Sequence, residues 1–339
     1  SLNYSREPGV MKESGRNTMG LGLSLQYRRK KWNIQNQLTL SNVRGDNSPY
    51  GSFSQYTRLN PYYRKTDENG RYTSFLDQKI LPGEGGGTVT VVNPLYNTLF
   101  KYKDFTENFN VVDNFTIECA IQENFRVSMG ASITKGISRM EKFKSMNHTE
   151  FIPQEDLTKK GSYEKNTGDN VAWSVNASVN YNYTKDKHLL SLFARWNVDE
   201  SKNNSVNLQA FGFPNDNMTD FLFAYEMDDR VRGSESTSRT VGLIGQVSYM
   251  YDMRFAVDFS VRGDLSSQFG ANTGMAPFWA AGARWNIHRE KWFQNTLISN
   301  LVVRGSYGVT GSQSYSPYQA KETYTYDDLL FPYPSSDIL

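Results

Sequence analysis

Ten segments of this chain alternate apolar and polar residues, and this pattern limits what the chain can fold into. In the first segment Leu21, Leu23 and Leu25 fall on one side of an extended backbone, with small or polar residues between them. In a later segment Val257 and Phe259 repeat the arrangement. A period of two is that of a β-strand, because successive side chains point to opposite faces of a sheet. The pattern therefore predicts many strands that are apolar on one face only.

The predicted strands are long. Strands of soluble sheets average about 5–6 residues, whereas a strand that crosses a membrane at a tilt needs about 9–11. All ten segments reach or exceed that membrane-crossing length. They lie at 17–28, 32–43, 106–119, 125–138, 171–184, 189–200, 237–250, 255–265, 276–287 and 297–309.

Short turns and long polar loops alternate between these strands. Tight turns are expected at 29–31, 121–124, 185–188 and 251–254. Long loops are expected at 44–105, 139–170, 201–236 and 266–275. Outer-membrane barrels have this asymmetry, with the short turns on the periplasmic side. The sequence therefore predicts an all-β fold: about ten strands from the wall of a larger antiparallel transmembrane β-barrel.

Composition fits this prediction and leaves one alternative open. Phe, Trp and Tyr make up 14% of the chain, and barrels concentrate aromatic residues at both membrane interfaces. The mean hydropathy of −0.62 argues against a helical membrane protein. The alternative is a secreted soluble β-sandwich that binds carbohydrate through aromatic loop residues. The net charge of +2 gives no reason to expect a nucleic-acid partner.

Residue types that carry catalysis or bind metals are sparse. His148, His188 and His288 are the only histidines, and none has a partner at ligand spacing. We interpret them as solvated residues of turns and loops. Cys119 is the only cysteine, so the chain can form no internal disulfide. We therefore expect no enzyme activity, no catalytic residue, no metal and no cofactor.

Several motifs resemble one family. The run S-Y-G-V-T-G-S-Q at 306–313 closely resembles a segment of the SusC/RagA-like TonB-dependent outer-membrane transporters of Bacteroidetes. The run F-A-V-D-F-S-V-R-G-D-L-S-S-Q-F-G at 255–270 resembles the family's R-x-D-G-S-S-x-F-G, with Leu265 where glycine is common. N-P-L-Y-N at 93–97 matches another family phrase. The resemblance extends over most of the chain in order and spacing.

The resemblance implies a function, a location and partners. It implies active uptake of a glycan or peptide nutrient across the outer membrane, and a barrel of 22 strands with a plugged lumen. Residues 1–339 would be part of one barrel domain, its middle section. The plug domain, the TonB-binding segment and the barrel C-terminus would lie outside this chain. The implied partners are a SusD-like surface lipoprotein, the TonB complex (through a part outside this chain), the remaining barrel and plug segments, and outer-membrane lipid.

Two sets of residues are candidates for function. The first set occupies the polar phase of the strands and is predicted to face the lumen: Gln26, Arg28, Asn176, Asn180, Asp258, Arg262, Arg284 and Arg304. The second set lies in the predicted loop 201–236 and is predicted to contact a partner or substrate: Phe211, Phe213, Phe221, Phe223, Tyr225, Arg230 and Arg232. The alternative for the rings of the second set is that they fold inward and brace the loop.

Overall fold

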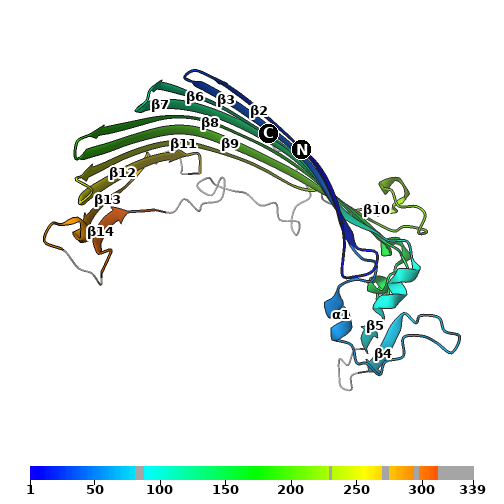
Figure 1. Ribbon diagram of the computed structural model, residues 1–339. Helices are drawn as coiled ribbons and strands as arrows, with labels where there is room; N and C mark the ends of the chain where they lie inside the picture. The colour runs from blue at the N-terminus through cyan, green and yellow to red at the C-terminus, as the bar shows by residue number, and fades with distance from the viewer. Residues whose placement is uncertain (81–87, 229–230, 269–274, 294–297, 312–339) are drawn as a thin grey trace, which may run out of the picture.

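Long antiparallel strands form most of the chain (Figure 1). The structure is a computed structural model that describes residues 1–80, 88–228, 231–268, 275–293 and 298–311. Its strands are β1 (Leu2–Pro8), β2 (Gly15–Arg29), β3 (Trp32–Asp46), β4 (Phe75–Ile80), β5 (Thr88–Val92), β6 (Lys103–Gln122), β7 (Phe125–Lys144), β8 (Ser162–Lys185), β9 (His188–Phe211), β10 (Glu226–Met227), β11 (Arg232–Tyr251), β12 (Phe255–Ser266), β13 (Ala276–Asn286) and β14 (Val302–Val309). The helices are α1 (Phe53–Thr57) and the short 3₁₀ turns η1 (Pro94–Leu99), η2 (Thr149–Phe151), η3 (Leu157–Lys159), η4 (Phe221–Phe223) and η5 (Ile287–Arg289).

One sheet of 12 strands contains all ten predicted strands. Its order is β1-β2-β3-β6-β7-β8-β9-β11-β12-β13-β14, with β10 paired to β9 at the side of this path. Strands that follow one another in the chain are therefore neighbours in the sheet, apart from the β4–β5 hairpin inserted between β3 and β6. The sequence missed β1, because its apolar alternation stops after Leu2 and Tyr4.

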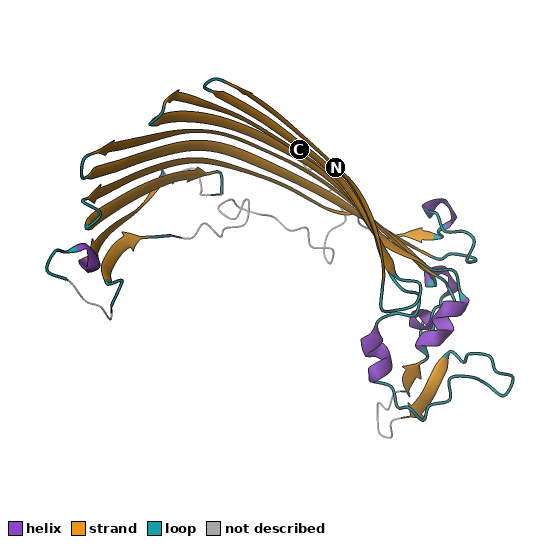
Figure 2. Ribbon diagram, viewed as in Figure 1, coloured by secondary structure: helices purple, strands orange, loops and turns teal. Residues whose placement is uncertain are grey.

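The sheet forms a single arched layer, as Figure 2 shows. A β-sandwich needs a second sheet packed face to face on the first. In the described part of the chain the only other sheet is the hairpin of β4 and β5. The soluble sandwich considered as an alternative is therefore wrong.

The short turns and the long connections gather at opposite ends of the strands (Figure 1). The turns that join β2 to β3, β6 to β7, β8 to β9 and β11 to β12 lie together at one end. Lys30, Asp186 and Asp252 in these turns have φ values of 50°, 52° and 51°. Such left-handed backbone is typical of tight hairpin turns, whose twist matches that of the flanking strands. α1, β4, β5 and β10 lie at the other end.

The register separates a polar face from an apolar face over eight neighbouring strands, β2 to β12. One row of directly opposed residues runs Gln26, Gln35, Thr116, Gly130, Asn176, Asn197, Gly242, Asp264. The next row, on the other face, runs Leu25, Asn36, Phe115, Ala131, Val175, Val198, Val241, Leu265. All eight residues that the sequence predicted to face the lumen lie on the polar face. Residues two apart in a strand share a face, and so do residues paired across neighbouring strands.

The apolar face has the height of a membrane. On β8 it begins at Tyr183, near the short turn, and continues to Trp173, beyond which Asp169 is charged. Ten residue steps at about 3.3 Å, tilted by about 40°, span roughly 25 Å. This equals the apolar band of about 25 Å that outer-membrane barrels present to lipid, with aromatic residues at both edges.

One acidic residue interrupts the apolar face. Asp113 lies opposite Leu38 and Ile133, and the pairing of β6 with β3 continues through it without a register shift. Asn36 Nδ2 donates a hydrogen bond of 2.6 Å to Asp113 Oδ1 across the two strands. The carboxylate is therefore accommodated by a polar partner on the same face.

The long loops are shorter than predicted, because the strands continue past the apolar band. β9 extends to Phe211 and β11 starts at Arg232, so about half of the predicted loop 201–236 is strand. β7 and β8 likewise shorten the predicted loop 139–170 to the residues between Lys144 and Ser162. Polar and charged residues are frequent in these extensions, which is why they were predicted to be loops, although Val206, Leu208 and Ala210 of β9 do alternate with polar residues. Residues 269–274 of the predicted loop 266–275 lie outside the described residues.

A small buried cluster forms where β7, β8 and β9 extend beyond the band. Phe143, Tyr163, Ala210 and Phe213 are buried together, and Phe221 packs against them. The rings of Phe143 and Phe213 meet edge to face, with centroids 5.4 Å apart. The described helices include none that is long and apolar enough to cross a membrane.

Candidate functional site

A cavity of about 680 Å³ lies at the long-loop end of the sheet. Its walls come from residues 48–59 after β3, from 90–97 around β5 and η1, and from 142–150 at the end of β7. Tyr102, just before β6, completes the lining. Ligand pockets in proteins have volumes of about 300–1,000 Å³. The cavity is therefore large enough for several units of an oligomeric ligand.

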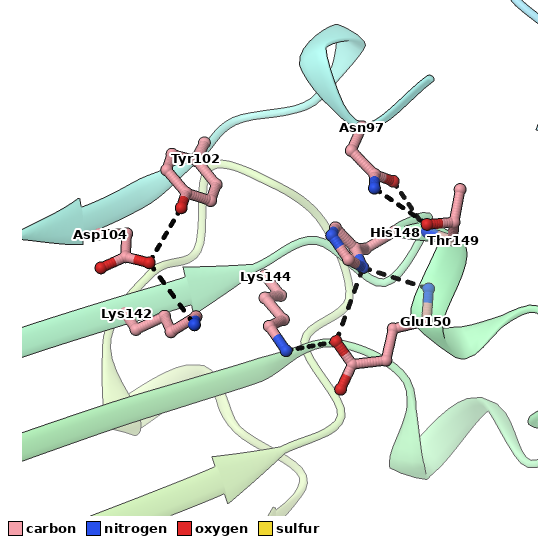
Figure 3. Close-up of polar contacts among 8 residues, drawn as sticks. All are labelled: Asn97, Tyr102, Asp104, Lys142, Lys144, His148, Thr149 and Glu150. Carbon is pink, nitrogen blue, oxygen red and sulfur yellow. Dashed lines mark hydrogen bonds and ion pairs between the residues drawn. The ribbon is translucent and has the colours of Figure 1, made fainter. Parts of the chain in front are cut away.

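On one side of the cavity a hydrogen bond joins Tyr102 to Asp104, and an ion pair joins Asp104 to Lys142 (Figure 3). The Tyr102 hydroxyl donates to Asp104 Oδ2 at 2.9 Å, and Lys142 Nζ lies 3.5 Å from the same oxygen. Burial and the bond to Asp104 raise the pKa of Tyr102 above its ordinary value. Tyr102 therefore stays protonated and keeps donating its hydrogen bond at any physiological pH.

The opposite side holds Lys144, Glu150 and His148 (Figure 3). Lys144 forms an ion pair with Glu150, and His148 Nδ1 lies 3.8 Å from Glu150 Oε2. The Glu150 backbone N–H donates to His148 Nδ1 at 3.1 Å, so this nitrogen acts as an acceptor. Burial, followed by the charge of Lys144, lowers the pKa of His148 to about 4. The imidazole is therefore neutral near pH 7.

Asn97 and Thr149 hold two walls of the cavity together. Asn97 Nδ2 donates to Thr149 Oγ1 at 2.9 Å, and the Thr149 backbone N–H donates to Asn97 Oδ1 at 2.9 Å. The apolar lining includes Tyr50 and Pro94. The cavity thus combines an apolar wall with charges of both signs, an arrangement that can bind a polar oligomer with amide or hydroxyl groups.

The sequence did not single out this cavity. Its prediction that His148 is a solvated loop residue is wrong, since the side chain is only 20% exposed. Lys142 and Lys144 alternate with Phe143 at the end of β7, so the sequence does place both lysines on one face. Their approach to residues 48–59 and 90–97 depends on long loops, whose path has no signature in the sequence.

The residues predicted to face the lumen do not form one compact site. They share the polar face but lie on β2, β8, β12, β13 and β14. Some pair locally: Gln26 donates to Asn33 at 2.8 Å, and Arg262 binds Asp264 at 2.6 Å. They are therefore spread over a broad area of the sheet and do not surround one pocket.

The aromatic residues of the second candidate set divide into two groups. Phe213 is 2% exposed and Phe221 packs on the same cluster, as expected if the rings brace the loop. Phe223 is 43% exposed and Tyr225 is 73% exposed. Phe211 lies at the end of β9 and is half-buried. The remaining residues of the set are charged: Arg232 lies 3.7 Å from Asp228, and Arg230 lies outside the described residues.

Sequence comparison relates the chain to curated receptors. No protein-family profile matches it. It is 22% identical over 333 residues to TonB-dependent receptor P39 of Formosa agariphila, covering 96% of this chain and 30% of that protein. It is 22% identical over 329 residues to TonB-dependent receptor P26 of the same organism, covering 95% of this chain and 32% of that protein. The chain is a relative of the TonB-dependent receptors.

Solved structures have the same fold as this chain. The RagAB peptide transporter matches 96% of the chain with a TM-score of 0.74 and 18% identity, over 37% of that chain. Its open-open state matches 91% with a TM-score of 0.71. This chain spans about a third of the length of the curated receptors that it matches. The likeness to RagAB shows that the chain has the fold of an outer-membrane β-barrel wall.

Proposed function

We propose that this chain forms part of the barrel wall of a transporter for active, TonB-dependent uptake of an oligomeric nutrient. In this proposal the apolar face meets lipid and the polar face lines the lumen. The observation that carries it is the register, which keeps the two faces separate over at least eight neighbouring strands. Alternation of this kind in a closed sheet is what a lipid-facing wall with a wet interior needs.

The wall described here needs further strands. The first and last strands of the sheet, β1 and β14, each pair on one side only among the described residues. An open edge in hydrocarbon would expose unpaired backbone groups, which is too costly to persist. We therefore propose that residues 1–339 belong to one barrel domain that other strands close and a plug fills. Its energy would come from the TonB complex.

The nutrient is proposed to be a peptide or a glycan that the long-loop end captures first. The cavity lined by Tyr102, Lys142, Lys144 and Glu150 supports this, because its charges of both signs and its apolar wall suit an oligomer. Its position at the end opposite the short turns corresponds to the extracellular side of outer-membrane barrels. RagAB, whose fold the chain shares, is described as a peptide importer, which favours a peptide.

A SusD-like surface lipoprotein is the proposed partner at this end. Leu222 is 83% exposed and Tyr225 is 73% exposed in the loop between β9 and β11, beside the half-exposed Phe223. Exposed aromatic and aliphatic side chains in one loop are typical of the centres of protein interfaces. The buried Phe213 holds the base of the same loop.

Uptake by cells that carry or lack the gene for this chain tests the proposal. Cells with the gene should accumulate a labelled peptide or oligosaccharide that is too large for porins, and cells without it should not. Removing TonB should abolish the difference. Competition by unlabelled peptides but not by oligosaccharides would assign the substrate as a peptide, and the reverse would assign a glycan. Equal uptake with and without the gene would refute the transporter.

A further inference from the structure

An uncharged area covers the polar face in the middle of the sheet. It consists of five alternate residues from each of the neighbouring strands β6, β7, β8, β9 and β11, within the ranges 108–116, 130–138, 168–176, 197–205 and 234–242. Among these 25 residues only Asp199 has a charged side chain, and its carboxylate accepts hydrogen bonds from Asn197 at 2.5 Å and from Thr240 at 3.3 Å. The others are Asn, Ser, Thr and Gly, apart from Val112 and Ala172. We call this area the neutral wall.

The other face of the same strands carries many charges at the same level. Twenty residues alternate with the neutral wall within these five ranges, and seven of them are charged: Asp113, Lys135, Asp169, Glu200, Lys202, Glu235 and Arg239. The register therefore keeps charges off the polar face in a part of the sheet that is otherwise rich in them. Surfaces that meet usually have complementary charges. A neutral wall therefore indicates that whatever meets this face is itself uncharged.

A hollow of about 280 Å³ lies in the neutral wall. Its lining includes Asn110, Asn170 and Ser205, and Gly136 and Gly168 line it without a side chain. Asn110 lies on β6 between β3 and β7, both of which are described, and its side-chain amide forms no hydrogen bond with another described residue. Such an amide can both donate and accept hydrogen bonds. The hollow therefore offers hydrogen-bonding groups to an uncharged polar ligand.

The hollow lies between the cavity at the long-loop end and the membrane-spanning part of the sheet. Lys142, which lines that cavity, and Ser138, which lines the hollow, lie on the same face of β7 four residues apart. On β8, Asn170 and Gly168 are three and five residue steps beyond Trp173, at the edge of the apolar band. At about 3.3 Å per step and a tilt of about 40°, the hollow is roughly 8–13 Å outside the band. Under the proposed topology a cargo from the cavity passes the hollow on its way into the lumen.

The spacing of the amides on the neutral wall matches an extended peptide. Asn108, Asn110 and Asn114 follow one another on β6 at intervals of two and four residues, and two residues of a strand span about 6.6 Å. The backbone N–H and C=O groups of an extended peptide recur with the same period. None of the 25 residues is aromatic, so the wall has no ring on which a sugar could stack. The neutral wall therefore suits the backbone of a peptide better than it suits a glycan.

We propose that the neutral wall binds the cargo peptide on its way into the lumen and selects a stretch without charged side chains. Its amides and hydroxyls form many individually weak hydrogen bonds, which let a cargo bind and then move on. A charged side chain would lose part of its hydration in the lumen and find no opposite charge on this wall. The inference rests on the proposed transporter function, to which it adds a cargo preference and the residues that set it.

Peptide uptake by cells that carry the complete receptor tests this preference. Three labelled peptides of one length have glutamine, glutamate or lysine at their central positions. We expect the glutamine peptide to have a half-saturation concentration several-fold lower than those of the two charged peptides. Because Ser205 lines the hollow, Ser205→Lys should lower the half-saturation concentration of the glutamate peptide several-fold and raise that of the lysine peptide. Ser205→Asp should do the reverse.

Val206 provides the matched control. It follows Ser205 on β9, but its side chain lies on the outer face and is 38% exposed. Val206→Lys and Val206→Asp should leave the order of the three peptides unchanged. The two Ser205 variants are expected to gain opposite preferences, and a loss of folding could not produce that result.

Three results would overturn the neutral wall as a selective surface. The first is an equal half-saturation concentration for the three peptides in the unmodified receptor. The second is an unchanged order of the peptides in both Ser205 variants, and the third is the same change in the Val206 variants. Uptake of neutral oligosaccharides but of none of the peptides would also overturn it, although the transporter proposal would stand. Equal uptake of every probe with and without the gene would refute the transporter itself.

Discussion

Placing a charge on the apolar face of β8 tests the membrane orientation of the sheet directly. Val179 is 38% exposed and lies between Val127 of β7 and Ala194 of β9, so its surroundings on this face are apolar. Tyr183 marks the edge of the apolar band near the short turn. Val179 is four residue steps from it, which at about 3.3 Å per step and a tilt of about 40° places it roughly 10 Å inside the band. In a band of about 25 Å it is therefore close to the midplane.

The expected loss of stability follows from that depth. An arginine near the midplane of a barrel wall costs about 2–4 kcal/mol. This corresponds to a folding equilibrium constant lowered roughly 30- to 1,000-fold, because each 1.4 kcal/mol is a factor of about ten. We expect Val179→Arg to show this loss in urea titrations of the complete receptor in lipid vesicles. The control Asn180→Arg, one residue along on the polar face, should lose less than about 1 kcal/mol, as surface changes usually do.

A thiol-labelling experiment checks the same orientation without a charge. After Cys119 is replaced by serine, a cysteine at position 179 should resist a water-soluble thiol reagent in intact membranes, and one at position 180 should not resist it. Equal losses of stability for the two arginine variants, or ready labelling at position 179, would refute the assignment of the apolar face to lipid.

Three further predictions concern the ends of the strands. An epitope inserted at Asn217 should be detected on intact cells and one at Asp186 only after permeabilisation; the reverse would invert the topology. Because burial and Lys144 hold the folded pKa of His148 near 4, below the unfolded value of 6.5, the stability that this residue contributes should be present above pH 6.5 and lost as the pH falls towards 4. Proteolysis of loop 145–161 should therefore rise over that interval, and His148→Gln should flatten the profile. Phe223→Ala should weaken association with the lipoprotein while the loop stays ordered, whereas Phe213→Ala should cost about 3–5 kcal/mol and disorder the loop; equal effects in a pull-down assay would contradict this division.

The sequence alone determined the strands inside the apolar band and the two faces they present. All ten predicted strands are present, and Leu21, Val175 and Phe259 share one face. The prediction succeeded because strand alternation is local, so the face of each residue follows from its neighbours along the chain. In a wall with lipid on one side, every strand also puts its apolar residues on that side. The short turns were predictable for the same reason.

Only the tertiary structure decided how the strands end and what meets beyond the band. There polar and charged residues are frequent, so the remaining alternation was too weak to predict the extension of β9 to Phe211 or of β7 to Lys144. The hydrogen bond from Asn36 to Asp113 joins residues 77 positions apart. The cavity at the long-loop end likewise depends on long connections. They bring Asn97 to Thr149 across 52 positions, and they bury His148 near Lys144. Burial and partnership between distant segments are set by chain path and register, and those are properties of the folded sheet rather than of any one stretch of sequence.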